Sequence, residues 1–253
     1  MLDRQTFLRP IAHRGLHNAA HGIIENTGPA FEAAIAKAYG IECDVRPVAG
    51  GLPIIFHDAT LDRLIEGEGQ VADLTASALK SLRHRISNAP ILTLAEMLEL
   101  IRGRVPLLIE IKSEWTTPDP AFLDAVTNLT LGYEGPVALM SFDPAVMTRI
   151  RDLAPRIPRG VISGSYRGTG WWSGKISDER AAALRDLLES GPAAPDFYAY
   201  DVNALPTPVT EYVRRVSGLP LFTWTVRTEE QQQIARQWAD AMIFEGFEPW
   251  SYS

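Results

Sequence analysis

The chain has 253 residues, which is enough for one large domain or two small ones. Apolar residues make up 46% and charged residues 22% of the sequence, a composition typical of a globular protein with a sizeable core. The net charge is −7 and no run of lysine and arginine occurs, which argues against a nucleic-acid-binding protein. Positive charge for an anionic ligand must then come from a metal ion and a few basic side chains.

The single cysteine, Cys43, excludes an internal disulfide and is compatible with a reducing compartment. The first residues show no apolar core or cleavage site of a secretory signal. No stretch approaches 18 uninterrupted apolar residues, so we expect no stable membrane insertion. These features predict a cytoplasmic protein.

Short apolar runs of β type alternate with helical patterns along the whole chain. The candidate strands are Pro10–His13, Gly40–Val45, Pro53–His57, Pro106–Lys112, Pro136–Ser141, Arg159–Ser163, Phe197–Val202, Pro220–Val226 and Asp240–Glu245. The candidate helices are Thr27–Ala38, Thr93–Arg102, Pro120–Leu131, Pro144–Leu153, Asp178–Ser190, Thr207–Val216 and Thr228–Ala239. Asp178, Thr207 and Thr228 are expected N-caps, and Thr93 opens a capping box with Glu96. This alternation predicts βα units and a parallel sheet.

Only seven residues separate Val45 from Pro53, too few for a parallel crossover. We therefore expect Glu42–Pro47 and Pro53–His57 to form a hairpin that turns at Ala49–Gly51. The other eight candidate strands then make a (β/α)₈ TIM barrel, for which about 250 residues is the usual size. The fold class predicted is α/β.

Pairing Val48 with Pro53 in this hairpin would place Asp44 directly opposite His57 at the mouth of the barrel. The 58–92 segment breaks the alternation, because it holds only short helical fragments such as Thr75–Leu82. We expect one domain over residues 1–253 with a small insertion at about 58–92.

Side chains alternate across a strand, so Glu42 and Asp44 share one face while Ile41, Cys43 and Val45 share the other. The apolar set suits the layer between barrel and helices. Two carboxylates then point into the barrel, where an unpaired charge is expensive. On their own they fit a structural ion-paired cluster as well as a functional one.

A second strand favours the interpretation of a functional cluster. In it Glu110 and Lys112 share one face, while Ile109 and Ile111 share the other. Three carboxylates and one lysine would face one space. Oxygen ligands without cysteine or clustered histidine suit Mg²⁺ or Ca²⁺ better than zinc. These residues fall at the carboxyl ends of their strands, where barrel enzymes carry their functional groups.

Two histidines also end strands. His13 and His57 lie beside the expected carboxylates and suit a general acid and base, since an unperturbed pKa near 6.5 serves both roles. His17, His21 and His84 lie in loop-like stretches, and we expect them to be solvated.

Arg14 and Lys112 would supply the positive charge that a phosphodiester requires. Arg14 is also placed to pair with Glu25, and the two roles are compatible. Gly15 would allow a sharp turn just after the first strand.

These motifs together resemble one enzyme family. The matching segments, in chain order, are Ala12-His13-Arg14-Gly15, Glu25-Asn26-Thr27, Phe31 with Ala34, Gly40-Ile41-Glu42-Cys43-Asp44-Val45, Pro53-Ile54-Ile55-Phe56-His57-Asp58, Leu61-Asp62-Arg63, Gly69-Gln70-Val71, Thr93-Leu94, Ile109-Glu110-Ile111-Lys112, Ser141-Phe142 and Thr223-Trp224-Thr225-Val226. The sequence resembles the glycerophosphodiester phosphodiesterases, a branch of the phosphatidylinositol-phospholipase-C-like barrel enzymes.

The resemblance implies a (β/α)₈ barrel with a small insertion after the His57-Asp58 strand. It also implies one Mg²⁺ or Ca²⁺ ion held by Glu42, Asp44 and Glu110, with His13 and His57 as the acid/base pair. The expected reaction is metal-dependent hydrolysis of a small-molecule glycerophosphodiester to glycerol 3-phosphate and an alcohol.

By the same resemblance, Arg14 and Lys112 hold the phosphate, Glu25 lies beside it, and Trp224 lines the alcohol pocket. The loop Tyr166–Trp172 departs from the family pattern. The identity of the alcohol is therefore the open part of the function.

Two alternatives remain at this point. Relatives on this barrel act on lysophospholipids or sphingomyelin as phospholipase D-type enzymes, and Trp171 and Trp172 would then anchor the enzyme to a lipid interface. We favour instead a loop in which both tryptophans pack against the barrel. A barrel that only binds phosphodiesters is the other alternative, although an acid/base pair of histidines argues against it.

Overall fold

The computed structural model describes residues 1–117 and 119–249. Its strands follow the hydrogen-bonded order β1-β9-β8-β7-β6-β5-β4-β2-β3, and β1 also pairs with β2. They are β1 (Ile11–Ala12), β2 (Gly40–Pro47), β3 (Pro53–Ile55), β4 (Leu107–Ile111), β5 (Val137–Ser141), β6 (Arg159–Ser163), β7 (Phe197–Asp201), β8 (Leu221–Val226) and β9 (Ala241–Phe244). The fold is a (β/α)₈ barrel, as predicted, with β3 as the additional antiparallel strand.

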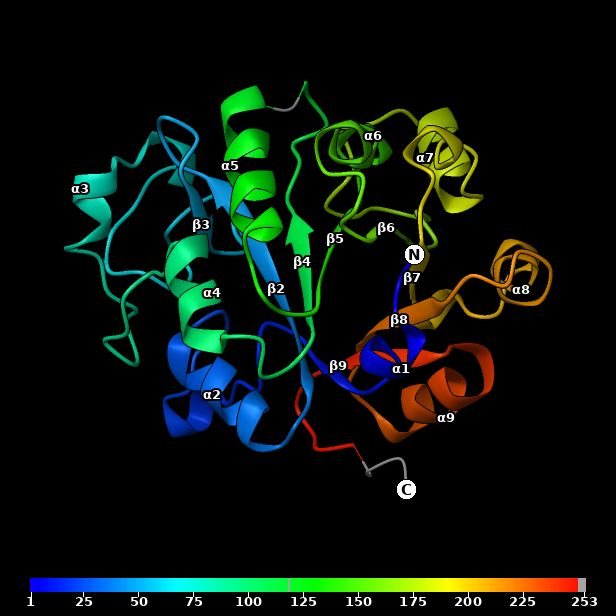
Figure 1. Ribbon diagram of the computed structural model, residues 1–253, viewed down its shortest axis with the longest axis horizontal. Coiled ribbons are helices and arrows are strands. Elements are labelled where there is room, and N and C mark those ends of the chain that lie inside the picture. Colours follow the sequence, from blue (N-terminus) through cyan, green and yellow to red (C-terminus); the bar gives the residue numbers. More distant parts are fainter. Residues whose placement is uncertain (118, 250–253) are drawn as a thin grey trace. The chain divides into compact units, whose positions relative to one another are not determined.

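The helices alternate with these strands (Figure 1). They are α1 (Arg4–Phe7), α2 (Gly28–Ala36), α3 (Ala76–Leu79), α4 (Leu94–Ile101), α5 (Pro120–Leu131), α6 (Pro144–Leu153), α7 (Asp178–Arg185), α8 (Pro208–Arg215) and α9 (Glu229–Trp238). Thr207 and Thr228 cap their helices and Thr93 forms the expected capping box with Glu96. The prediction of Asp178 as an N-cap was wrong, because the N-cap of α7 is Ser177, whose side chain accepts a hydrogen bond from the backbone N–H of Arg180. No helix in the described residues is long and apolar enough to cross a bilayer.

The hairpin of β2 and β3 is antiparallel, as predicted, but its register was predicted one residue wrong. Pro47 pairs with Pro53, and the Asp44 carbonyl accepts the backbone N–H of Phe56 at 3.0 Å, so Asp44 lies opposite Phe56 and not His57. The turn is tighter than expected because Gly50 and Gly51 both have positive φ, 81° and 78°. His57 therefore lies beyond the end of β3, in a loop.

The chain divides into two compact units by its internal contacts. One unit comprises Ala12–Lys112 and Pro118–Val137, and the other comprises Met1–Ile11, Ser113–Thr117 and Ala138–Ser253. In the first unit β2 and β4 run parallel, and α2, α4 and α5 pack in a row beside them (Figure 1). The prediction of one domain with an insertion stays a prediction.

The 58–92 segment of the first unit has its own small apolar cluster. Phe56, Leu61, Ile65 and Val71 are at most 3% exposed, and Leu79 of α3 packs with them. Burial of these side chains folds the segment back onto the end of β3, because apolar side chains lose contact with water there.

The second unit carries strands β6 to β9 in parallel register. Six aromatic side chains meet in it, and we call them the aromatic cluster: Trp115, Phe142, Tyr166, Trp171, Trp172 and Trp224. Trp172 packs edge-on against Tyr166, while Trp171 is 46% exposed.

Candidate active site

Three carboxylates lie together on the neighbouring strands β2 and β4, and we call them the carboxylate cluster: Glu42, Asp44 and Glu110. Glu42 is only the third residue of β2, so, contrary to the prediction, it does not lie at the carboxyl end of that strand. Asp44 pairs with Glu110 in the parallel register, so both side chains leave the sheet on one face. Glu42 and Asp44 are 1% exposed and Glu110 is 7% exposed. On the opposite face Cys43 Sγ lies 3.4 Å from Met97 Sδ of α4, which confirms the predicted alternation.

Two cations face this cluster. Lys112 Nζ lies 2.8 Å from Asp44 Oδ1 and 2.7 Å from Glu110 Oε1. Arg14 Nε lies 3.1 Å from Asp44 Oδ2. Burial favours the neutral carboxyl of Asp44, yet Lys112 and Arg14 hold its pKa well below the usual value.

Glu42 is the carboxylate that these cations compensate least. Burial, followed by the charges of Asp44 and Glu110, raises the pKa of Glu42 well above its usual value. The three residues offer oxygen atoms that all lie within 4.8 Å of one another. An excess of buried carboxylate charge with oxygen donors at this spacing fits a hard divalent cation, which would stabilise the ionised form of Glu42.

Arg14 reaches the cluster through a strained turn after β1. Its φ is 55°, in the left-handed region, and its backbone N–H donates to Glu42 Oε2 at 3.0 Å. Gly15 follows with φ 79°, and a Cβ there would lie 2.8 Å from the carbonyl carbon of Ala30. The predicted turn at Gly15 is confirmed, and no larger residue fits it without displacing α2.

The Arg14 guanidinium also pairs with Glu25, as expected, because its Nη1 donates to Glu25 Oε1 at 2.7 Å. Burial raises the pKa of Glu25, but hydrogen bonds and charges from Arg63 and Arg14 outweigh this effect and lower it to about 2. Glu25 is therefore ionised at neutral pH and holds Arg14 in place.

His13 and His57, the predicted acid/base pair, both lie in the first unit. His13 Nε2 is 3.9 Å from Glu42 Oε2. His57 Nδ1 hydrogen bonds with Asp58 Oδ1 at 2.7 Å. An ionised carboxylate on Nδ1 favours the tautomer that carries its proton there, which leaves Nε2 for proton exchange.

The expectation for the other histidines was wrong for His84, which is 2% exposed. Its Nδ1 hydrogen bonds to the carbonyl of Ala89 and its ring lies 6.4 Å from that of Phe56. Burial lowers the pKa of His84 and keeps it neutral. His21 is exposed as expected, and His17 is half-buried.

Three further residues contact the candidate site although no role was predicted for them. Asn26 exchanges two hydrogen bonds with Asp44, one from its side chain at 2.8 Å and one from the Asp44 backbone at 3.3 Å. Asp58 and Arg63 connect His57 to Glu25. All three belong to the motifs that match the family, and that match was the only signal for them in the sequence.

Trp224 lies in the second unit, on β8. Its ring packs edge-on against Phe142 with 5.1 Å between centroids. Its indole nitrogen is buried and has no hydrogen-bond partner among residues 1–117 and 119–249. A buried N–H of this kind is costly unless a ligand or water satisfies it.

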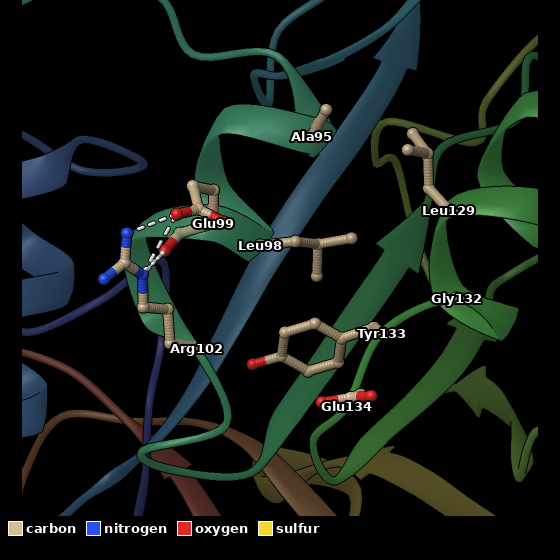
Figure 2. A pocket seen from close by; sticks show the side chains of 8 residues that line it. All are labelled: Ala95, Leu98, Glu99, Arg102, Leu129, Gly132, Tyr133 and Glu134. Atoms are coloured by element: carbon tan, nitrogen blue, oxygen red, sulfur yellow. Dashed lines mark hydrogen bonds and ion pairs between the residues drawn. The ribbon is translucent and has the colours of Figure 1, made fainter.

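A separate pocket on the first unit lies between α4 and the turn after α5 (Figure 2). Figure 2 shows the ion pair of Arg102 and Glu99 on one side and the ring of Tyr133 on the other. The Tyr133 hydroxyl accepts the backbone N–H of Gly103 at 2.7 Å, just before β4 begins. This is the amino-terminal end of the strand, the side that serves stability in such barrels, and the carboxylate cluster is not among its lining residues.

Comparison with known proteins agrees with this geometry. Residues 13–245 match the model of the glycerophosphoryl diester phosphodiesterase family. A glycerophosphodiester phosphodiesterase of Caldanaerobacter subterraneus subsp. tengcongensis is 29% identical, and the alignment covers 92% of each chain. Glycerophosphodiester phosphodiesterase 1 of Mus musculus is 30% identical over 88% of this chain and 72% of its own.

Solved structures show the same fold. A phosphodiesterase of Oleispira antarctica in complex with the product sn-glycerol-3-phosphate has a TM-score of 0.71 at 22% identity, covering 94% of this chain and 92% of its own. A putative glycerophosphoryl diester phosphodiesterase of Silicibacter pomeroyi also has a TM-score of 0.71, at 23% identity, covering 94% and 90%. The extent of the family match decides the assignment: the chain belongs to the glycerophosphoryl diester phosphodiesterase family of phosphoric diester hydrolases.

Proposed function

We propose that the protein hydrolyses glycerophosphodiesters to sn-glycerol 3-phosphate and an alcohol, with one divalent cation and two histidines as acid and base. The observation that supports this most is the buried carboxylate cluster, in which Glu42 lacks full compensation by the neighbouring cations. Its oxygen donors would hold Mg²⁺ or Ca²⁺. When bound, the cation supplies positive charge that stabilises the negative charge developing on the phosphoryl oxygens.

Arg14 and Lys112 would bind the phosphate together with this cation. Both are already oriented toward Asp44, so little side-chain entropy is lost when the substrate arrives. Glu25 would act beside the phosphate by holding Arg14 at 2.7 Å. The binding of an anion next to three carboxylates requires these two cations, because like charges otherwise repel.

His13 and His57 would transfer the protons. One histidine accepts a proton from the attacking oxygen, which belongs to water or to a neighbouring glycerol hydroxyl. The other protonates the departing alkoxide. Asp58 on His57 Nδ1 supports the role of this ring, since proton exchange then uses Nε2.

The alcohol would contact Trp224. The buried indole N–H of this residue would donate to an oxygen of the substrate, which satisfies a donor that has no partner in the described part of the chain. A lysophospholipid substrate is the second candidate, and the 46% exposure of Trp171 is the observation that favours it. The packing of Trp172 against Tyr166 favours a structural role for that ring.

Release of the alcohol, choline or ethanolamine, from glycerophosphocholine, glycerophosphoethanolamine and micellar lysophosphatidylcholine, with added Mg²⁺ or Ca²⁺, tests the proposal. We expect turnover of a soluble diester that a chelator abolishes and that His13→Ala and Glu42→Ala lose. His21→Ala and Glu99→Gln are matched controls, because both residues are exposed. Full activity in either site variant would contradict the assignment. Faster turnover of the micellar substrate would favour the lipid alternative, and tight binding without turnover would favour a binding protein.

A further inference from the structure

Arg63, in the 58–92 segment, connects two carboxylates with four hydrogen bonds. Its Nε and Nη2 donate to Asp58 at 2.7 and 3.0 Å, and its Nη1 and Nη2 donate to Glu25 at 2.8 and 2.7 Å. A guanidinium has five N–H groups, so nearly all of them are already used although the side chain is 47% exposed. Arg63 therefore holds protein groups and has little capacity left for the substrate phosphate.

Each of these carboxylates also hydrogen bonds to a residue that we have proposed for the reaction. Asp58 Oδ1 accepts from His57 Nδ1 at 2.7 Å. Glu25 Oε1 accepts from Arg14 Nη1 at 2.7 Å. A single guanidinium thus lies between the proposed acid/base histidine and the proposed phosphate-binding arginine.

We propose that Arg63 is a positioning residue of the phosphodiesterase site, which orients His57 through Asp58 and Arg14 through Glu25. The proposal rests on the roles proposed above for His57 and Arg14. Lysine would not replace Arg63, because an ammonium group has three donors on a single nitrogen and cannot make the four hydrogen bonds that the planar guanidinium makes from three nitrogens. Asp58 and Glu25 stay ionised beside it, since hydrogen bonds and charges from their partners outweigh burial and lower both pKa values.

The competing explanation is that Arg63 only fastens the 58–92 segment to the rest of the unit. Arg83 offers a matched control for that explanation. Its Nη1 donates to the carbonyls of Lys80 and Leu82 at 2.7 Å, both within the segment. Arg83→Ala would weaken the segment and leave the contacts of His57 and Arg14 in place.

Steady-state kinetics on the diester that the wild type turns over fastest is the first test. We expect Arg63→Ala to lower kcat/KM by about 10²-fold, because small displacements of catalytic groups have effects of this size. Both kcat and KM should change, since one connection serves the acid/base group and the other serves the phosphate. Arg63→Lys should resemble Arg63→Ala, and Arg83→Ala should stay within about threefold of the wild type, as expected away from reacting groups.

Chemical rescue separates positioning from folding. Millimolar guanidinium should restore part of the activity of Arg63→Ala, whereas sodium chloride at the same ionic strength should not. Asp58→Asn should remove most of the effect of Arg63→Ala on kcat when the two are combined, because groups that act through one another are not additive. Additive effects, an unimpaired Arg63→Ala, or equal losses in Arg63→Ala and Arg83→Ala without rescue would overturn the proposal.

Nitrogen-15 NMR of the histidine rings gives a readout that does not depend on turnover. His57 should carry its proton on Nδ1 in the wild type and in Arg83→Ala, and should show a mixture of tautomers in Arg63→Ala. An unchanged His57 spectrum in Arg63→Ala would overturn the positioning role. A wild type that releases no glycerol 3-phosphate would instead contradict the proposed function, and the NMR result would still decide whether Arg63 controls the ring.

Discussion

The carboxylate cluster of β2 and β4 consists of charged groups that are almost excluded from water, whereas the aromatic cluster consists of rings of which one, Trp171, is half exposed. The carboxylate cluster is held by ion pairs of 2.7 to 3.1 Å from Lys112 and Arg14. The aromatic cluster is held by ring contacts between 4.8 and 6.4 Å, with the Arg180 guanidinium 5.0 Å from the Trp115 ring.

The difference between the two regions is one between groups that we expect to serve function at a cost in stability and groups that we expect to raise stability. Buried like charges destabilise the folded chain unless a cation joins them, and a metalloenzyme uses that instability to bind its metal. Aromatic packing stabilises the loops that carry it and tolerates many shapes of ligand. Removing a group should therefore have opposite consequences in the two regions.

Glu42→Gln should give the largest effect. We expect metal-dependent turnover to fall about 10³-fold, because a cation site contributes several kcal/mol to transition-state stabilisation. The chelator-treated variant should unfold at a higher temperature than the chelator-treated wild type, since the substitution removes a buried carboxylate repelled by Asp44 and Glu110. Turnover assays and thermal unfolding measure the two effects, and lower stability together with lost activity would refute the idea of a strained metal-free cluster.

Phe142→Ala tests the aromatic cluster. Its ring contacts those of Trp171 and Trp224, so we expect the free energy of unfolding to fall by about 2 kcal/mol, somewhat less than for a fully buried phenylalanine. The inhibition constant of sn-glycerol 3-phosphate should change little, because its phosphate is bound by charge. Urea unfolding and competition kinetics provide the measurements. A large loss of affinity for sn-glycerol 3-phosphate with unchanged stability would contradict the proposal that the aromatic cluster serves stability and the charged residues bind the phosphate.

The loss of folding stability at low pH should come from the charged residues around the carboxylate cluster, such as Glu25. The pKa of Glu25 falls from 4.5 to about 2 on folding, so its stabilising contribution is present above pH 4.5 and is lost as the pH falls toward 2. Glu25→Gln should therefore show a weaker loss of stability than the wild type across this window. Urea unfolding at a series of pH values measures it, and parallel profiles for both proteins would exclude Glu25 as a source.

The smallest effect should come from a charge pair outside both regions. Arg104 pairs with Glu32, and the two side chains are 42% and 51% exposed. Arg104→Ala should change the free energy of unfolding by less than about 1 kcal/mol and leave turnover intact, because water screens exposed pairs. A loss comparable to that of a site variant would mean that charge, and not burial, distinguishes the carboxylate cluster.

The local patterns predicted much of the fold and the candidate site. Periodicity located every strand of the barrel, and alternation placed Glu42, Asp44, Glu110 and Lys112 on one face of β2 and β4. These predictions held because each depends on the two-residue repeat of a strand, which neighbouring segments do not alter.

The burial of His84 could not be read in the same way. It depends on how the 58–92 segment returns to Phe56, and a polar residue in an irregular stretch carries no periodic signal for such contacts. The N-cap of α7 was missed by one residue because Ser177 and Asp178 both suit that position.

The sequence by itself was enough to predict a metal-binding barrel hydrolase. The carboxylates on one strand face follow from the alternation of neighbouring residues, and the order of the motifs can be read directly along the chain. Tertiary structure alone decided the hairpin register that puts Phe56 opposite Asp44, and the contact of Arg63 with Asp58, the hydrogen-bond partner of His57. The reason is physical: a turn with two left-handed glycines shifts the pairing by one residue, and only the folded segment brings a distant guanidinium within hydrogen-bonding distance of Glu25.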